Sequence, residues 1–545
     1  SQDMGTPDSD DDLYPHGDSG GDSGEAEDEY WYDAKVAKPD DYATTPGTYT
    51  GVVCATDAAI ATETPPIALH TDLTPVTANA PVARTYLPFT VQMVEGAIGD
   101  GWAKQLTGIG EDAMSSMVTT ATGECYVAGT TTGPIDFGLG EVTPPHFGTY
   151  EILVAKLDAL GAPLWLKAYG SNGFDSAGDL ALDSSGNLYL TGGVGGDSIQ
   201  FDPLGPNHTV TGGTGGFLLK VDPNGDYLWS RVWSAANGGL EGSGVAVTTA
   251  GEIVATGNYL GTVDFGPAGT LPNDSVFHAD GYLLALNSSG LELRTGKIGG
   301  TMDAYAWHCA AQPDGSIAVG GYFNADLVLD GSTTRNSLGD MDTYIVNYDP
   351  TGFTRNWDHE YGSVGRDDLT DVASLKSGYL GIVGTVVGPT NFGAGTVALP
   401  NAQDSMFVVT YSPTGAYNWS FTAEIESGST LFARGRTLVG DSRGDVYVMG
   451  SVAGQLKAPL TSYCSNGDNL IVKLSPTGGI LWERHTGAFR LDDPGDCGLG
   501  LDDNLVYAYT FTEITAPDPE NSTAFINSTG NTDGMVSMIL RDGNW

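Results

Sequence analysis

Residues 179–193 read DLALDSSGNLYLTGG, which is two alternating apolar runs around a Ser-Ser-Gly-Asn turn. Alternation with a period of two is typical of β-strands. Glycine and asparagine tolerate the positive φ that tight hairpin turns require. The stretch therefore predicts a β-hairpin, and its relatives elsewhere in the chain decide the fold.

The hairpin recurs along the chain at a fixed period. In one series a short β run ends in a glycine, at Gly129, Gly192, Gly257, Gly320, Gly384 and Gly450, with Thr510 in the same register. In a second series a turn glycine follows a hydrophobic run, at Gly161, Gly225, Gly290, Gly352, Gly415, Gly478 and Gly543. Both series recur every 60–66 residues, and such self-similarity indicates a repeat architecture. The two series agree on seven units.

Each unit contains the pattern of four strands. After the hairpin at 179–193 come the β run GFLLKV (216–221), a Pro-Asn-Gly turn and a strand that begins near a tryptophan, LWSRVW (228–233). No stretch shows a sustained 3.6-residue stripe. Four-stranded units repeated seven times predict an all-β fold, a seven-bladed β-propeller over residues 102–545. A single blade cannot bury both of its faces, so neighbouring blades must stack around an axis.

The two ends of this region complement each other. Six turn glycines are followed by a last strand, which begins near Trp165, Trp229, Arg294, Trp357, Trp419 and Trp482. The seventh turn, at Gly543, is followed only by Asn544 and Trp545. Residues 102–108, WAKQLTG, match the missing strand. We therefore expect this N-terminal strand to complete the seventh blade and to remove its open edge.

The repeat pattern D-x-G-N-x-Y-x-T-G, then D-F-G, then A-K-L-D-x-x-G-x-x-x-W resembles the bacterial β-propeller repeat family of secreted and surface lipoproteins. The middle element stands at Asp136-Phe137-Gly138, Asp264-Phe265-Gly266 and Asn391-Phe392-Gly393. The resemblance implies an extracellular or cell-surface location in a bacterial envelope. It implies no shared catalytic site.

The region before residue 102 has a different composition. Residues 1–41 carry 14 acidic side chains against Lys35 and Lys38, and such a self-repelling stretch predicts a disordered acidic spacer. The spacer is similar to the tether of bacterial lipoproteins. This resemblance implies attachment to a lipid at the N-terminus as one possibility. Residues 42–101 are rich in Thr, Ala and Pro and contain two β-like runs, Thr48–Thr56 and Tyr86–Val94. We expect this segment to pack on the propeller.

The overall charge excludes several partners. The chain has 68 acidic and 22 basic residues, a formal net charge of −46. Nonspecific binding to nucleic acid or to an anionic membrane surface requires positive charge and is not expected. No run of 18 uncharged apolar residues occurs, so no membrane-spanning segment is expected. The acidity also fits a saline habitat, which would say nothing about function.

The sequence predicts no catalytic residue, no metal site and no cofactor. The eight histidines show none of the spacings that metal sites use. Residues 476–482, PTGGILW, look like the tryptophan-docking motif of quinoprotein propellers. Quinoprotein dehydrogenases carry adjacent cysteines near the cofactor, however, and no two of the five cysteines adjoin here. We therefore expect the tryptophans to pack between blades.

Two groups of side chains are candidate site residues. Five aspartates fall near the starts of the predicted innermost strands, around the mouth of the central channel: Asp112, Asp175, Asp303, Asp367 and Asp493. They form either an acidic rim for cations or a basic partner or, as the favoured alternative, acceptors for loop amides. Cys464 falls in the second-to-third-strand loop of the sixth unit, and Cys497 falls just inside the first strand of the seventh. These places should lie on the same face of adjacent blades, which suggests a disulfide and an oxidising compartment.

The leading functional hypothesis is a noncatalytic extracellular or cell-surface propeller that binds a protein or surface polymer, or scaffolds an assembly. The long loops between second and third strands, such as 130–151 and 193–215, would contact the partner, because loops on a rigid frame usually carry recognition. The alternative is a propeller enzyme, a hydrolase or lyase, that uses carboxylates at the channel mouth.

Overall fold

The chain divides into two units, residues 1–95 and 96–545. The computed structural model describes residues 47–55, 85–93 and 101–544, apart from 109, 147–148, 203, 211–213, 274, 276, 332–333, 401–402, 427–430, 461–462, 488–491 and 516–525. In the first unit, β1 (Gly47–Ala55) pairs antiparallel with β2 (Thr85–Met93), where the two β-like runs are predicted. The predicted acidic spacer, residues 1–41, lies outside the described residues. The packing of residues 42–101 on the propeller stays a prediction.

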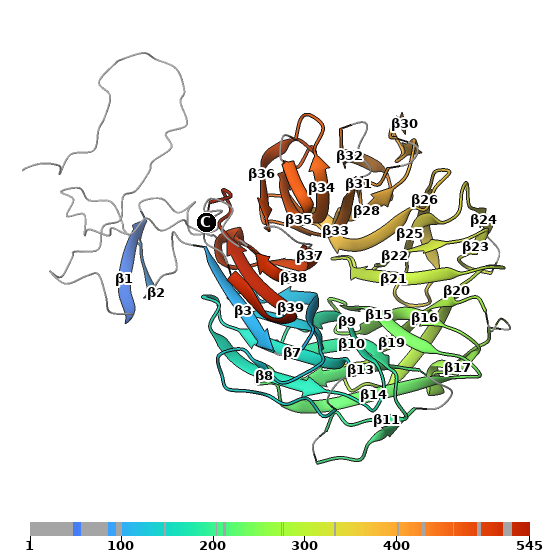
Figure 1. Cartoon of the computed structure of the whole chain (residues 1–545), viewed down its shortest axis with the longest axis horizontal. Coiled ribbons are helices and arrows are strands. Elements are labelled where there is room, and N and C mark those ends of the chain that lie inside the picture. Colours follow the sequence, from blue (N-terminus) through green and yellow to red (C-terminus); the bar gives the residue numbers. More distant parts are fainter. Residues whose placement is uncertain are drawn as a thin grey trace, which may run out of the picture. The chain divides into compact units, whose positions relative to one another are not determined.

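The second unit is an all-β propeller (Figure 1). Its strands pair antiparallel in consecutive sets of four, and we name each set a blade after its innermost strand. The β4 blade holds β4 (Asp112–Thr119), β5 (Cys125–Thr131), β7 (Glu151–Leu157) and β8 (Pro163–Tyr169). The β9 blade holds β9 (Asp175–Leu182), β10 (Leu188–Val194), β13 (Gly215–Val221) and β14 (Tyr227–Ala236). The β15 blade holds β15 (Leu240–Val247), β16 (Ile253–Tyr259), β19 (Asp280–Leu286) and β20 (Glu292–Ile298).

The same order continues around the ring. The β21 blade holds β21 (Ala304–Ala311), β22 (Ile317–Phe323), β25 (Asp342–Tyr348) and β26 (Arg355–Tyr361). The β27 blade holds β27 (Asp368–Ser374), β28 (Leu380–Val386), β31 (Ser405–Tyr411) and β32 (Tyr417–Ala423). The β33 blade holds β33 (Ala433–Gly440), β34 (Val446–Gln455), β35 (Tyr463–Leu474) and β36 (Ile480–Thr486). The β37 blade holds β37 (Asp492–Leu499), β38 (Leu505–Thr515), β39 (Ile526–Ile539) and β3 (Trp102–Gly108).

Short elements fill the loops. The small strands are β6 (Ile135–Asp136), β11 (Ser198–Ile199), β12 (His208–Thr209), β17 (Thr262–Asp264), β18 (Thr270–Leu271), β23 (Asp326–Val328), β24 (Thr334–Asn336), β29 (Thr390–Asn391) and β30 (Thr396–Val397). The described residues contain no α-helix, only the 3₁₀ turns η2 (Gly266–Ala268), η3 (Lys376–Gly378) and η4 (Leu501–Asp503). One parallel bridge, Asp280 to Ala304, joins the β15 and β21 blades into a single eight-stranded sheet. No helix in the described part of the chain is long and apolar enough to cross a membrane.

The β37 blade is composed of both ends of the second unit, as the sequence predicts. β3 pairs antiparallel with β39 from Trp102 opposite Met538 to Leu106 opposite Gly534. The Leu106 side chain is fully buried in a cluster with residues of β4, β5, β7 and β39. The last strand of the chain therefore has no open edge, because the first strand of the propeller covers it.

A β-bulge interrupts the innermost strand of every blade, and it explains the first series of glycines. In the β9 blade the register shifts so that Gly192 lies opposite Ala177 and Thr191 opposite Asp179. A Cβ on Gly192 would lie 2.0 Å from the Ser176 carbonyl oxygen, so no side chain fits there. The same close approach occurs at Gly129, Gly257, Gly321, Gly384 and Gly450. In the β21 blade the position is Gly321, one residue after the Gly320 of the sequence pattern.

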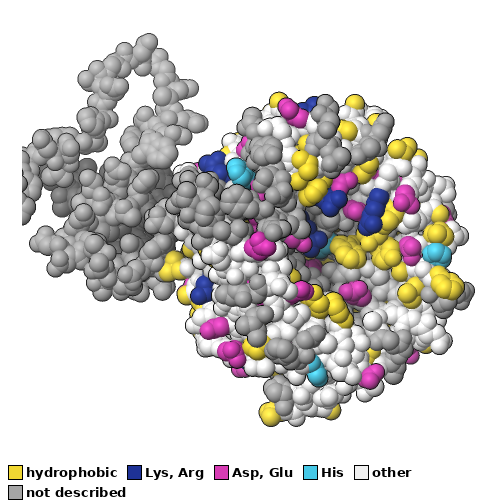
Figure 2. All heavy atoms as spheres, viewed as in Figure 1, with side chains coloured by type: hydrophobic (Ala, Val, Ile, Leu, Met, Phe, Trp, Pro, Cys, Tyr) yellow, Lys and Arg dark blue, Asp and Glu magenta, His cyan; other side chains and the backbone are white. Residues whose placement is uncertain are grey.

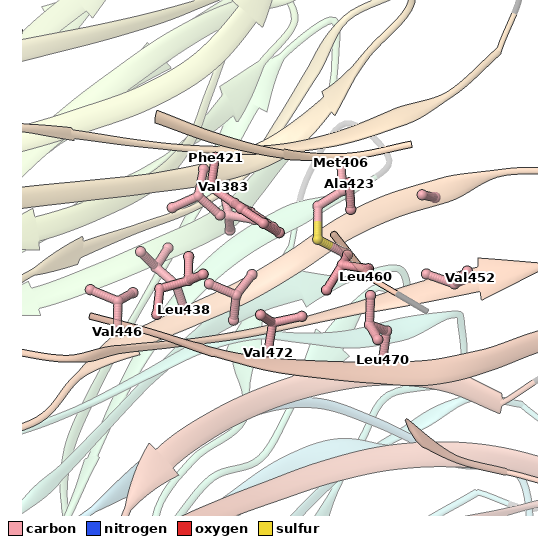
Figure 3. Close-up of a cluster of buried hydrophobic side chains, with 14 of the residues drawn as sticks. Val383, Met406, Phe421, Ala423, Leu438, Val446, Val452, Leu460, Leu470 and Val472 are labelled. Carbon is pink, nitrogen blue, oxygen red and sulfur yellow. The ribbon is translucent and has the colours of Figure 1, made fainter. Parts of the chain in front are cut away.

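Adjacent blades bury apolar side chains between their faces. Figure 3 shows the cluster between the β27 and β33 blades, in which Phe421 and Val383 face Leu438 and Val446. Met406 and Leu470 continue the cluster toward the other end of the strands. Each blade is thus a partner that covers the apolar face of the next, which is why a single blade is not stable alone.

The repeated tryptophans pack between blades, as the sequence predicts. The indole of Trp165 lies against Gly225, the turn glycine of the next blade, and its Nε1 donates a hydrogen bond of 3.1 Å to the Pro223 carbonyl oxygen. Gly225 has a φ of +80°, which favours glycine, and its missing side chain makes room for the ring. The arrangement recurs for Trp229 on Gly290, Trp357 on Gly415, Trp419 on Gly478, Trp482 on Gly543 and Trp102 on Gly161.

Candidate functional site

A cavity of about 170 Å³ lies at the centre of the ring. Innermost strands of all the blades line it, from Ser116 on β4 to Asp496 on β37. The space-filling view of the propeller shows a hollow at this centre (Figure 2). The polar lining residues are Ser115, Ser116, Asp179, His308, Thr370, Asp371, Arg436, Thr437 and Asp496.

The bulges place these side chains. The residue that follows the bulge occupies an equivalent position in each blade: Ser116, Asp179, Gly244, His308, Asp371, Thr437 and Asp496. A bulge re-aims the side chains next to it and increases the local twist of the strand. Three carboxylates therefore meet at one level of the ring although they are far apart in the sequence.

Each of these three carboxylates bonds to the innermost strand of the next blade. Asp179 Oδ2 accepts the backbone N–H of Val245 at 2.9 Å. Asp371 Oδ2 accepts the N–H of Leu438 at 3.0 Å. The third, Asp496 Oδ2, accepts the N–H of Met117 at 2.8 Å, across the β37–β4 boundary. The carboxylates thus hold neighbouring blades together around the cavity.

Two hydroxyl groups connect the carboxylates. Ser116 Oγ lies 3.0 Å from Asp179 Oδ1 and 3.3 Å from Asp496 Oδ2. Thr437 Oγ1 lies 2.7 Å from Asp496 Oδ1 and 3.0 Å from Asp371 Oδ2. A hydroxyl has one hydrogen to donate, so it serves two carboxyl groups fully only when one of them is protonated.

The electrostatics of the cavity favour such protonation. Burial raises the pKa of Asp179 to about 7, and the charge of Asp496 adds to the shift. Burial also raises the pKa values of Asp371 and Asp496, and the negative charge of Asp371 raises that of Asp496 further. The imidazole of His308, whose Nδ1 lies 3.9 Å from Asp371 Oδ1, has its pKa lowered to about 4 by burial and by Arg436. The histidine is therefore neutral at pH 7, and the raised pKa values favour a proton on the carboxyl groups over one on the imidazole.

These raised pKa values predict that stability falls as pH rises. The Asp179 carboxyl group binds more protons in the folded protein than in the unfolded chain between about pH 4, the ordinary aspartate pKa, and about pH 7, so its contribution to the free energy of unfolding decreases across that window. The lowered pKa of His308 acts in the opposite direction below about pH 6.5, which is why the comparison is made with a variant of Asp179 alone. We expect the variant Asp179→Asn to lose about 2 kcal/mol less between pH 5 and pH 8 than the wild type. Urea unfolding at the two pH values measures this difference, and equal losses in both proteins would contradict it.

The structure places three of the predicted rim aspartates against loop amides. Asp175 accepts the Ser171 N–H at 2.5 Å and the Gly195 N–H at 3.1 Å. Asp367 accepts the Ser363 N–H at 2.6 Å and the Val387 N–H at 2.7 Å. Asp303 accepts the Ala279 N–H at 2.8 Å. Bonds of this kind order the loops between blades.

The other two rim aspartates behave differently. Asp112 begins β4 and is fully buried, and no described residue donates a hydrogen bond to either of its carboxylate oxygens. The prediction of Asp493 is off by one residue: β37 begins at Asp492, which is buried, whereas Asp493 is exposed. Asp492 and Asp493 are adjacent, so the sequence pattern alone does not distinguish which of them begins the innermost strand of this blade.

The predicted Cys464–Cys497 disulfide is wrong for this structure. Cys497 is a free, buried thiol whose Sγ lies 3.5 Å from Thr437 Oγ1. Its equivalent in the β33 blade is Leu438, which pairs with Val448, whereas Cys464 pairs with Gly454. Six residues of β-strand span about 20 Å, far beyond the reach of a disulfide. The Cys464 side chain lies outside the described residues.

The sequence reasoning missed Asp179, Asp371 and Asp496 as cavity residues. Asp179 is the first residue of the hairpin at 179–193, and each of the three aspartates directly precedes an apolar residue of an innermost strand. Aligning the repeats on the first series of glycines places Asp179 and Asp371 at one level, 13 residues before Gly192 and Gly384, whereas Asp496 lies 14 residues before Thr510. Among the described residues, no three His, Cys, Asp or Glu side chains form a group that could hold a metal ion.

No protein-family model matches the chain, and no curated protein matches it either. Solved structures similar to it include the quinohemoprotein alcohol dehydrogenase from Comamonas testosteroni, at 10% identity and a TM-score of 0.38 over 82% of this chain and 77% of that one. They also include the Pan2 WD40 domain of Neurospora crassa, at 7% identity and a TM-score of 0.35 over 80% of this chain and 95% of that one. An ulvan lyase of polysaccharide lyase family PL25 has 11% identity and a TM-score of 0.38 over 74% of this chain and 93% of that one. Likeness this distant identifies neither a reaction nor a partner for this chain.

Proposed function

We propose that this protein is a noncatalytic propeller that binds a partner, a protein or a surface polymer, through the loops of one face. In every blade, the loop between the second and third strands and the connection to the next blade leave from the same end of the strands, because consecutive strands are antiparallel. We call this end the entry face. The short hairpin turns lie at the opposite end.

The observation that carries the proposal is the exposure of large apolar side chains in entry-face loops. Phe277 is 84% exposed, Leu338 71% and Val364 72%, and Met302 is also exposed. These four lie in successive loops of the β15, β21 and β27 blades, and we call them the apolar arc. Leu139, Phe174 and Leu204 are further exposed apolar residues of entry-face loops. The five most exposed large apolar side chains of the described residues all lie in entry-face loops, whereas the six near the hairpin turns are about half-exposed: Leu164, Leu228, Leu291, Leu293, Leu481 and Leu501. Strongly exposed apolar side chains confined to one face are typical of an interaction surface.

The central cavity supports a noncatalytic function. Its volume of about 170 Å³ is smaller than the roughly 300–1,000 Å³ of most small-molecule sites. Its carboxylates already accept backbone amides of the next blade, so their geometry is accounted for by blade-to-blade bonding. The alternative, a hydrolase or lyase, is favoured by one observation, the raised pKa values of the same carboxyl groups.

Three finer properties belong to the same proposal. We propose that the ring has seven blades, which the two glycine series support through their period of 60–66 residues. The repeat motifs support membership of the bacterial propeller family of secreted and surface lipoproteins. An extracellular or cell-surface location is supported by that resemblance and by the acidic composition of residues 1–41.

A pair of substitutions in the apolar arc tests the proposal. We expect the double variant Phe277→Ser/Val364→Ser to recover at least ten-fold less of its partner than the wild type when both are used as bait with native envelope extract. The control is Leu164→Ser/Leu481→Ser, which removes half-exposed apolar side chains near the opposite end of the blades. Quantitative mass spectrometry of the captured material gives the ratio. Equal recovery by the two double variants would contradict a partner site on the entry face.

The enzyme alternative makes a different prediction for the same material. If the cavity carboxyl groups cleave an envelope polymer, soluble fragments appear with the wild type and with the arc variant but not with Asp371→Asn. Chromatography of the supernatant distinguishes the two functions, since a binding protein releases no fragments in any of these samples.

A further inference from the structure

The boundaries between blades repeat one backbone arrangement. The backbone N–H at the start of an innermost strand bonds to the carbonyl that precedes the third strand of the previous blade, as in Asp175 N–H to Tyr150 O at 2.9 Å. The residue that donates this bond lies beside the residue that follows the acceptor carbonyl, and we call these two residues a seam pair. Three seam pairs consist of two acidic residues, Glu151/Asp175, Asp342/Asp367 and Asp533/Asp112. A fourth, Asp468/Asp492, occupies the same position in the repeat, and both of its carboxylates lie beside Gly487.

The pair Asp533/Asp112 closes the ring. Glu111 and Thr532 form a parallel bridge, which brings the two residues that follow them, Asp112 and Asp533, side by side. Both aspartates are fully buried. Asp533 Oδ2 accepts a hydrogen bond of 2.6 Å from Gln105 Nε2 on β3. This seam therefore joins the first strand of the propeller, the last strand and the next blade.

The Asp112 carboxylate has no partner that explains its burial. Among the residues that the structure describes, neither Oδ1 nor Oδ2 has a hydrogen-bond donor. The nearby hydroxyl of Thr131 donates its hydrogen to the Gly133 carbonyl oxygen at 2.9 Å and so is not available. No lysine or arginine nitrogen of the described residues lies within 4 Å of Asp112. A buried carboxylate in this position requires a positive charge or a proton.

Another seam shows how the fold supplies that charge when only one carboxylate is present. At the β15–β21 boundary the seam pair is Asp280/Ala304, and Lys297 Nζ lies 2.6 Å from Asp280 Oδ2. The positive charge of Lys297 therefore compensates the buried Asp280 carboxylate at that boundary. At Asp342/Asp367, where both members are acidic, Asp342 Oδ1 again has no donor although the side chain is buried.

We propose that the acidic seam pairs, and Asp533/Asp112 above all, bind a divalent cation of the calcium type. Carboxylate oxygens are the donors that hard cations prefer, and Ca²⁺ completes six to eight ligands with backbone carbonyls and water. Two carboxylates without a third give a weak site, with a dissociation constant of roughly 10⁻⁴–10⁻³ M, as in extracellular calcium modules. The bound cation links β3 and β39 to β4 and stabilises the closure of the ring.

Calcium titration of the full chain tests the proposal. The protein is treated with EDTA, dialysed at pH 8, and titrated with CaCl₂ at an ionic strength held constant with NaCl, because a chain of charge −46 is stabilised by any salt through screening. We expect equilibrium dialysis with radioactive calcium to show saturable binding and the melting temperature to rise with it. Asp112→Asn should lose one bound equivalent and most of the thermal shift.

The matched control is Asp280→Asn, which changes the seam pair whose cation is Lys297. We expect it to bind as many equivalents of calcium as the wild type, even if its melting temperature is lower. Absence of saturable binding by the wild type at constant ionic strength would overturn the proposal, and so would full calcium stoichiometry in Asp112→Asn. If Asp112→Asn does not fold, as judged by near-UV circular dichroism, the wild-type stoichiometry and the variant Asp342→Asn decide instead.

Discussion

A chain that begins at residue 109 is expected to unfold at a much lower temperature than one that begins at residue 96. The shorter chain lacks β3, so β39 becomes an open edge strand and the buried site of Leu106 becomes a cavity. Trp102 is also lost from its position on Gly161 of the next blade. Removal of a buried leucine or tryptophan costs about 2–5 kcal/mol each, so the two together cost on the order of 6 kcal/mol.

Comparison of these two chains isolates the strand, because both lack residues 1–95. Differential scanning calorimetry gives the melting temperatures, and light scattering reports association through the exposed edge of β39. A synthetic peptide of residues 101–108 should restore part of the lost stability when added to the shorter chain. Equal melting temperatures for the two chains would show that β3 does not close the ring.

The strand pattern could be predicted from the sequence because its causes are local. Alternation and turn residues place the hairpins, and the marker glycines are constrained by an innermost-strand carbonyl 1.8–2.1 Å from where a Cβ would lie. The turn glycines are constrained by the tryptophan of the neighbouring blade, as at Gly225. A contact that occurs in every blade requires the same residue type at the same position of each repeat. The internal repeats of a single sequence are therefore enough to predict it.

The central cavity could not be predicted in the same way. Asp179, Asp371 and Asp496 come together because a bulge shifts the register of each innermost strand by one residue, and a register shift depends on pairing rather than on composition. The Cys464–Cys497 prediction is wrong for a different reason, the position at which a strand begins. It treats Cys497 as a rim residue, whereas β37 begins five residues earlier and places it in the body of the blade.

The lysine that recurs in three of the third strands, in the motifs KLD, KVD and KLS, has a physical role that the repeat pattern alone does not reveal. Lys473 Nζ lies 3.0 Å from Asp441 Oδ2 and donates a hydrogen bond of 2.9 Å to the Tyr447 hydroxyl. It also lies 4.4 Å from the centre of the Tyr447 ring. Lys156 and Lys220 have equivalent partners, Glu124 with Tyr126 and Asp183 with Tyr189. The charge of each of these three lysines is thus neutralised at the first hairpin of its own blade.

Replacement of this lysine is expected to have a large effect where the ion pair is most buried. The side chains of Lys473 and Asp441 are 4% and 0% exposed, so Lys473→Met leaves a buried, uncompensated carboxylate and should cost about 3–5 kcal/mol. Lys156→Met is the matched control, because Glu124 is 33% exposed and can be hydrated; it should cost about 1 kcal/mol. Urea unfolding followed by tryptophan fluorescence measures both losses. The double variant Lys473→Met/Asp441→Asn should recover part of the stability, since it removes the orphaned charge. A Lys473→Met loss no greater than that of Lys156→Met would mean that burial does not set the strength of these pairs, and that water reaches Asp441 in the folded protein.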